Sequence, residues 1–143
     1  MPTTATPSSA TVVRLGIALV AAAAVNTLLA LGASSLDEGG IGMGLNAGSY
    51  LPATVIGLLI GTAGWFLIAR RAPKALRVVV PVALVATWIP DLLLFTAGAT
   101  AANVIGLMLM HLTVATVVVL ALRPTLPDSA PAPAAGDVQQ ARG

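Results

Sequence analysis

Four apolar runs of about 20 residues each, separated by short polar stretches, decide what this chain can fold into. A run of this length crosses the roughly 30 Å hydrocarbon core of a bilayer as one α-helix. Of the 143 residues, 57% are hydrophobic and only 8% are charged, so the side chains that would solvate a water-soluble surface are scarce. The sequence therefore predicts an all-α integral membrane four-helix bundle with short loops.

The expected spans are residues 12–32, 50–69, 78–97 and 103–122, which form one domain over residues 12–122. The flanking segments, residues 1–11 and 123–143, are rich in Pro, Ser, Thr and Ala without periodicity, so we expect two disordered tails. A signal peptide is the alternative for the first run, because Ala30-Leu31-Gly32 resembles a small-x-small cleavage site. The run exceeds the about 7–15 apolar residues of a signal peptide, and Arg14 at its start is its single basic residue, which favours a retained span.

The basic residues predict the orientation of the bundle. Four spans with both tails on one side place every Lys and Arg on that side, and Asp37 and Glu38 on the other. The positive-inside rule then predicts a multi-pass protein of the plasma (inner) membrane with both termini in the cytoplasm. The turn between the second and third spans can also contact anionic lipid headgroups, although its role in topology already explains its charge. Its basic residues are Arg70, Arg71, Lys74 and Arg77.

Three polar side chains interrupt the apolar runs: Asn26, Asp91 and His111. At a rise of 1.5 Å per residue, Asp91 and Asn26 lie about 9 Å and His111 about 12 Å below the outer ends of their spans. Asp91 and His111 are on antiparallel neighbours joined by a tight turn, so we expect a direct or water-bridged contact. Such a layer is either a polar clamp between helices or a small site for a ligand or protons. The inner halves of the spans carry no titratable side chain, which favours the clamp.

Pro90 predicts a kink in the third span, because it cannot donate a backbone hydrogen bond to the carbonyl of Ala86. Thr87 is placed to satisfy the freed backbone from within the helix. The kink could shape a cavity beside Trp88, or it could fit the helix around its neighbours, which is the commoner role.

The second span carries a face of small residues, Ala53, Gly57 and Gly61, repeated every four residues. Small side chains let helix backbones approach closely, so this face is expected to pack on another helix. The partner helix could belong to the same chain or to a homodimer.

The chain contains no Cys and a single His, so we predict no metal site and no cofactor. The run Gly40-Ile41-Gly42-Met43-Gly44 lacks the preceding strand, the Lys and the Ser/Thr of a phosphate-binding loop. Asp37 and Glu38 alone fall short of a Ca²⁺ shell. A net charge of +2 with 3% aromatic residues argues against nucleic-acid binding. No catalytic triad, carboxylate pair or zinc-protease motif is present, so no enzyme is expected.

Three short motifs resemble a known family: Arg70-Arg71-x-Pro73 at the basic turn, Pro90 late in the third span, and Leu109-Met110-His111-Leu112 in the fourth. Together they are similar to a domain-of-unknown-function family of small actinobacterial four-helix integral membrane proteins. The resemblance covers about residues 12–122. It implies the four-span architecture and Met110-His111 as a family feature, and it implies no activity. The place of Asp91 is usually uncharged in that family.

These observations favour a non-enzymatic membrane protein with a structural or partner-associated role. Two alternatives remain: a small proton-coupled carrier using Asp91 and His111, and an intramembrane binder of a lipid or apolar small molecule near Pro90. The expected partners are membrane lipids, further copies of the chain or another membrane protein.

Overall fold

Four long helices account for nearly all of the computed structural model, which describes residues 8–126. They are α1 (Ser9–Leu36), α2 (Ala47–Arg71), α3 (Leu76–Leu93) and α4 (Ala101–Leu122). One short 3₁₀ helix, η1 (Pro73–Ala75), lies in the turn between α2 and α3, and two others, η2 (Leu94–Ala97) and η3 (Arg123–Thr125), directly follow α3 and α4. No strand occurs between residues 8 and 126. The all-α prediction is confirmed, and each of the four helical segments is long and apolar enough to cross a membrane.

All four helices begin two or three residues before the expected spans, and polar caps hold the first turns of α1 and α4. Ser8 caps α1, its hydroxyl accepting a hydrogen bond from the amide of Thr11, so the helix begins three residues before the expected span. Thr100 caps α4 in the same way through the amide of Asn103. Most of the two expected disordered tails lies outside the described residues, but their inner ends at residues 9–11 and 123–125 are helical.

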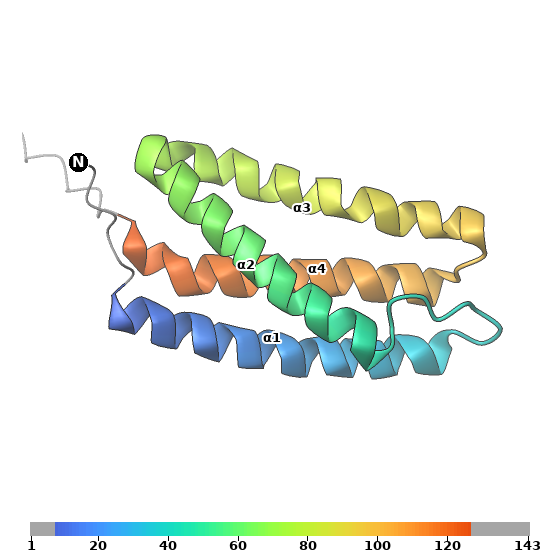
Figure 1. Cartoon of the computed structure of the whole chain (residues 1–143). Coiled ribbons are helices and arrows are strands. Elements are labelled where there is room, and N and C mark those ends of the chain that lie inside the picture. The colour runs from blue at the N-terminus through green and yellow to red at the C-terminus, as the bar shows by residue number, and fades with distance from the viewer. Residues whose placement is uncertain (1–7, 127–143) are drawn as a thin grey trace, which may run out of the picture.

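Successive helices run in opposite directions, and α1 and α4 lie side by side along most of their length (Figure 1). Their approach is close because small residues meet: a Cβ at Gly106 would lie 2.6 Å from the Cβ of Ala33. On α2, a Cβ at Gly57 or Gly61 would lie 3.3 Å from Val114 or Val118 of α4. The small-residue face of the second span therefore packs within the chain. Ala53 is exposed and does not share this packing.

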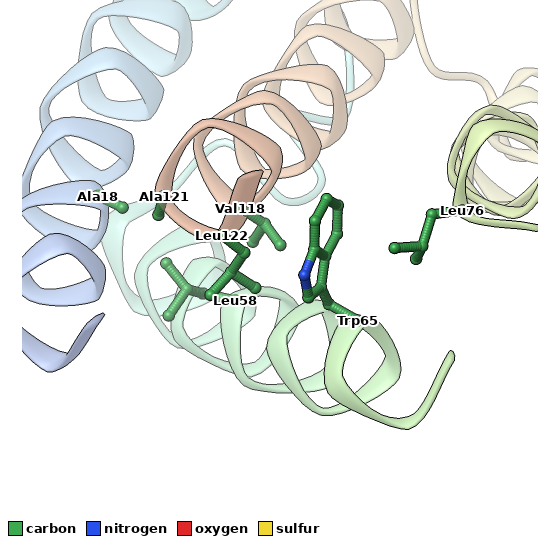
Figure 2. Packing of buried hydrophobic residues seen from close by; sticks show 7 residues of the cluster. All are labelled: Ala18, Leu58, Trp65, Leu76, Val118, Ala121 and Leu122. Atoms are coloured by element: carbon green, nitrogen blue, oxygen red, sulfur yellow. The ribbon is translucent and has the colours of Figure 1, made fainter. Parts of the chain in front are cut away.

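The largest buried apolar cluster lies at the end of the bundle where α2 turns into α3 (Figure 2). Its central side chain is Trp65, which is buried and donates its indole N–H to the hydroxyl of Thr125 over 3.3 Å. The cluster joins all four helices, and its buried members are Ala18, Leu58, Trp65, Leu76, Val118, Ala121 and Leu122.

At the opposite end, the loop of residues 37–46 is fastened to the start of α4. The carboxylate of Asp37 accepts a hydrogen bond from the Gly42 amide, 2.9 Å away, and another from the hydroxyl of Thr100. Asn103, fully buried, donates from Nδ2 to the carbonyl of Met43 over 2.9 Å. Gly44 has a φ of +81°, and a Cβ there would lie 2.9 Å from the side chain of Leu107. Only glycine combines this backbone conformation with so close an approach.

The alternating helix directions separate the charges. Arg14, Arg123 and the basic residues of the α2–α3 turn lie at one end, here called the basic end. Asp37 and Glu38 lie at the other, here called the loop end. The predicted orientation was based on this separation of charges, which the structure contains. The side of the membrane that each end faces stays a prediction.

Candidate functional site: a cavity between α2, α3 and α4

α3 is the least enclosed helix of the bundle. Only Leu76 and Asp91 along its length are buried, and its packing is mainly against α4. Figure 1 shows α2 and α3 joined at the basic end and spread apart toward the loop end. Because the two helices diverge, the space between them is not filled by side chains, and a cavity of about 720 Å³ remains there.

The cavity is bounded by α2 and α3 on its sides and by α4 along its length. Its α4 wall runs from Leu107 to Val119, about 18 Å at the rise of an α-helix. The α3 wall is a stripe with a spacing of three and four residues: Leu76, Val79, Val80, Ala83, Leu84 and Thr87. At the basic end the cavity is apolar and ends against Trp65 and Leu76, while its polar side chains lie from the middle toward the loop end: Asn26, Ser49, Tyr50, Thr54, Thr87 and His111.

His111 and Asp91 meet beside this cavity, as the depth argument from the sequence predicts. His111 Nδ1 lies 3.0 Å from the carbonyl oxygen of Leu107 and 3.0 Å from Oδ2 of Asp91. Since a helix carbonyl can only accept, Nδ1 donates to Leu107, and the carboxylate contacts the same nitrogen out of line with that bond. The Asp91 side chain is 8% exposed and that of His111 is 40% exposed. Asp91 therefore stands behind the imidazole, and His111 faces the cavity.

Asn26 does not join this pair. It is 1% exposed and donates from Nδ2 to the hydroxyl of Thr54 on α2 over 2.8 Å. Thr54 donates in turn to the carbonyl of Tyr50, and the Tyr50 hydroxyl donates to Thr27 on α1. The three polar side chains thus form two clamps, one between α1 and α2 and one between α3 and α4, and Asn26 and His111 both border the same cavity.

The residues expected to shape a cavity near Pro90 do so only in part. α3 continues as one helix through Pro81 and Pro90. The hydroxyl of Thr87 donates to the carbonyl of Leu84, not to that of Ala86. Trp88 donates from Nε1 to the carbonyl of Met108 over 3.2 Å, which ties α3 to α4. Of the three residues expected at a kink cavity, Thr87 lines the cavity found here, whereas Trp88 and Pro90 do not.

Other parts of the molecule offer less to a ligand. Arg70, Arg71, Lys74 and Arg77 are all exposed at the basic end and outside the cavity. A shallow hollow on α1 is lined by apolar and glycine residues alone. Over residues 8–126, no three side chains of the kinds that bind metals gather in one place.

Two residues of the site, Thr54 and Gly64, could not be identified as such from the sequence. Thr54 looks like any other threonine of an apolar helix, most of which bond only to their own backbone. Gly64 lines the cavity, and a Cβ there would have nothing within 4 Å. It shares a helix with Gly57 and Gly61, and only the position of α3 separates its role from theirs.

Residues 5–128 of the chain match the model of a protein family described as "Family of unknown function (DUF6069)". No curated protein and no solved structure matches the chain.

Proposed function

The chain belongs to the DUF6069 family of unknown function, and we propose from its geometry that it is a non-enzymatic membrane protein. It binds a lipid or apolar small molecule in the cavity between α2, α3 and α4. The observation that carries the proposal is a cavity of about 720 Å³ with apolar walls and a few polar groups. Binding sites for small molecules typically have volumes of about 300–1,000 Å³ and this kind of lining.

The position of the cavity defines what can enter it. The four helices are consistent with a multi-pass membrane protein, and α2 and α3 have few direct contacts beyond their connecting turn. A cavity whose side wall is open between two lipid-facing helices is reached from the bilayer. Its walls are chiefly apolar along α3 and along the basic-end half of α2. A molecule already dissolved in the membrane meets such walls without first being desolvated.

The polar groups give the bound molecule a direction. Asn26, Thr54 and His111 border the middle and loop-end half of the cavity, whereas Trp65, Leu76 and their neighbours close an apolar half at the basic end. An amphipathic molecule would therefore lie with its apolar body toward Trp65 and its polar group beside His111.

A proton-coupled carrier is less well supported. Asp91 and His111 are in contact, but a proton path needs further relay groups. The described lining side chains between this pair and the basic end of the cavity are apolar or small, apart from Trp65 and Thr87. The Thr87 hydroxyl already donates to the carbonyl of Leu84 in its own helix. The geometry thus favours a binding site that is closed at its basic end.

A helix of a partner protein is the other candidate for the space between α2 and α3, in keeping with a partner-associated role. The side of α3 that lines the cavity is apolar over about two and a half turns, from Leu76 to Leu84, and would suit lipid or protein alike. Thr54 and His111 on the opposing walls favour a ligand with a polar group.

The test compares a glycine substitution that fills the cavity without a clash with a control substitution outside the cavity. A Cβ at either Gly64 or Gly32 has no neighbour within 4 Å, so neither substitution causes a clash. Gly64→Phe places the new side chain in the cavity, whereas Gly32→Phe is the control on α1, away from the cavity. Each protein is extracted in native lipid particles, and the bound molecules are identified by mass spectrometry of organic extracts. We expect a defined apolar compound at constant stoichiometry with wild type and Gly32→Phe, and its loss with Gly64→Phe.

Equal recovery of that compound from all three proteins would contradict the proposal. Recovery of a second polypeptide that leaves only with Gly64→Phe would replace the ligand by a partner helix.

A further inference from the structure

The hydrogen bonds around the cavity define which polar group its ligand carries, and this inference rests on the proposed function. The side chains that border the cavity include donors and acceptors, and the protein already uses nearly all of the donors. Every lining hydroxyl and the lining indole N–H donates within the chain: Ser49 to Asn46, Tyr50 to Thr27, Thr54 to Tyr50, Thr87 to Leu84 and Trp65 to Thr125.

His111 supplies an acceptor that the protein does not use. Nδ1 carries a hydrogen, because it lies 3.0 Å from a backbone carbonyl and 3.0 Å from a carboxylate, both of which accept. In a neutral imidazole with its hydrogen on Nδ1, Nε2 holds a lone pair and accepts. No hydrogen bond to Nε2 is found among residues 8–126, the side chain is 40% exposed, and His111 is one of the residues that line the cavity.

We infer that the ring presents its Nε2 edge to the cavity, because its Nδ1 edge is occupied by contacts within the chain. The Nδ1 edge is turned toward the backbone of α4 and toward Asp91, which itself is buried and does not line the cavity. The Leu107 carbonyl accepts the Nδ1 hydrogen, and Asp91 acts as a positioning residue that lies against the same nitrogen, so both favour one tautomer and one orientation of the imidazole.

A second unused acceptor belongs to Asn26, which also borders the cavity. Oδ1 of Asn26 is buried and has no hydrogen-bond partner among residues 8–126, while Nδ2 of the same amide donates to Thr54. Buried polar atoms are normally paired, so an unpaired acceptor next to a cavity indicates a donor that is not part of the chain.

We propose that the cavity binds an apolar alcohol, whose hydroxyl group donates a hydrogen bond to Nε2 of His111 while its apolar body extends toward Trp65. A carboxylate, an ester or an ether offers only acceptors and has no hydrogen to donate to these acceptors. A hydroxyl group suits both a site of unused acceptors and an apolar surrounding.

The tautomer can be measured directly because the chain contains a single His. The full chain, purified without a histidine tag and labelled with ¹⁵N-histidine, is placed in lipid nanodiscs. We expect a pyrrole-type resonance for Nδ1 and a pyridine-type resonance for Nε2. Two pyrrole-type resonances, or the pyridine-type signal on Nδ1, would overturn the proposal.

Ligand selectivity is tested with tetradecanol and its methyl ether, which differ in the hydroxyl hydrogen. Saturating tetradecanol should shift the Nε2 resonance upfield, whereas the ether should leave it in place. In competition, the alcohol should bind about threefold to tenfold more tightly than the ether, as expected for one net hydrogen bond. His111→Phe should remove this preference and His111→Gln, which keeps an acceptor, should retain part of it. If His111→Phe does not fold, the resonances of the wild-type histidine decide.

The outcomes separate the two proposals. Equal binding of alcohol and ether, both lost in Gly64→Phe, would overturn the hydroxyl assignment and leave the cavity as a binding site. Binding of neither compound to wild type would overturn the hydroxyl assignment together with the proposed single-chain ligand.

Discussion

Nδ1 of His111 lies 3.0 Å from Oδ2 of Asp91, and this contact joins the middle of α4 to the loop-end part of the otherwise exposed α3. Together with the bond from Trp88 to the carbonyl of Met108, it holds α3 at a distance from α2. The position of α3 in turn keeps the cavity open. The contact is therefore structural and also forms one wall of the candidate site.

Disruption of this pair should destabilise the bundle in a coupled manner. We expect Asp91→Asn and His111→Phe each to lower the unfolding free energy, and the double variant to lose less than the sum of the two. The coupling should be about 0.5–2 kcal/mol, as for side chains in direct contact. Thermal unfolding of the four proteins in one detergent measures it, and additive effects would show that the two residues act independently.

Gly106→Ala should destabilise the packing of α1 on α4. The added Cβ would lie 2.6 Å from that of Ala33, so the helices must move apart, at a cost of about 1–3 kcal/mol. Gly16→Ala on α1 is the matched control, since a Cβ there has no neighbour within 4 Å. We expect a lower melting temperature for the first variant only. Equal melting temperatures would mean that α1 and α4 are less closely packed.

Thr54→Val should weaken the link between α1 and α2. The substitution keeps the shape of the side chain but leaves Nδ2 of Asn26 without its acceptor 2.8 Å away. A loss of about 0.6–1.7 kcal/mol is expected for a hydrogen bond between membrane helices. Thr116→Val is the control, because the exposed Thr116 hydroxyl donates only to Leu112 of its own helix. Similar losses in both variants would contradict a role for Thr54 between helices.

Asp37→Ala should release the loop of residues 37–46 from α4. Without the carboxylate, the Gly42 amide loses its acceptor at 2.9 Å and Thr100 loses its partner. Amide exchange at Gly42 should become about threefold to tenfold faster, as for the loss of one net hydrogen bond. Glu38→Ala, at an exposed neighbouring carboxylate, should leave that rate unchanged. An unchanged rate in Asp37→Ala would show that the loop does not depend on this contact.

The predicted orientation can be tested in a chain that has no Cys of its own. Glu38→Cys places a thiol at the loop end and Lys74→Cys places one at the basic end. A membrane-impermeant maleimide added to intact cells should label the first variant and leave the second unlabelled until the cells are opened. The reverse pattern would place the basic end outside.

The helices and one of the two clamps could be predicted from the sequence because they depend on length and depth. Apolar runs of about 20 residues fix the number of spans. Asp91 and His111 lie at similar depths on neighbouring antiparallel helices, which is sufficient to bring them together. The helix ends were less predictable, since the hydroxyl of Ser8 extends α1 beyond the apolar run.

The cavity and the other clamp could not be predicted because they depend on how the helices lean. Thr54, Thr87 and Thr116 look equivalent in the sequence, yet only Thr54 faces the buried amide of Asn26. The divergence of α2 from α3 follows from packing at Gly57 and Gly61 against α4 on one side and from the Asp91–His111 contact on the other. The pattern of residues along either helix does not determine the angle between the two helices.

The opening between α2 and α3 has a consequence for how occupancy of the cavity is regulated. For a ligand that arrives through this opening, the concentration that sets occupancy is its mole fraction in the bilayer. Modest intrinsic affinity therefore suffices wherever that molecule is an abundant membrane component. Since binding to the folded state alone adds stability by mass action, the thermal stability of the protein should follow the composition of its membrane. The same chain would be more robust in one membrane than in another without any change in its own contacts.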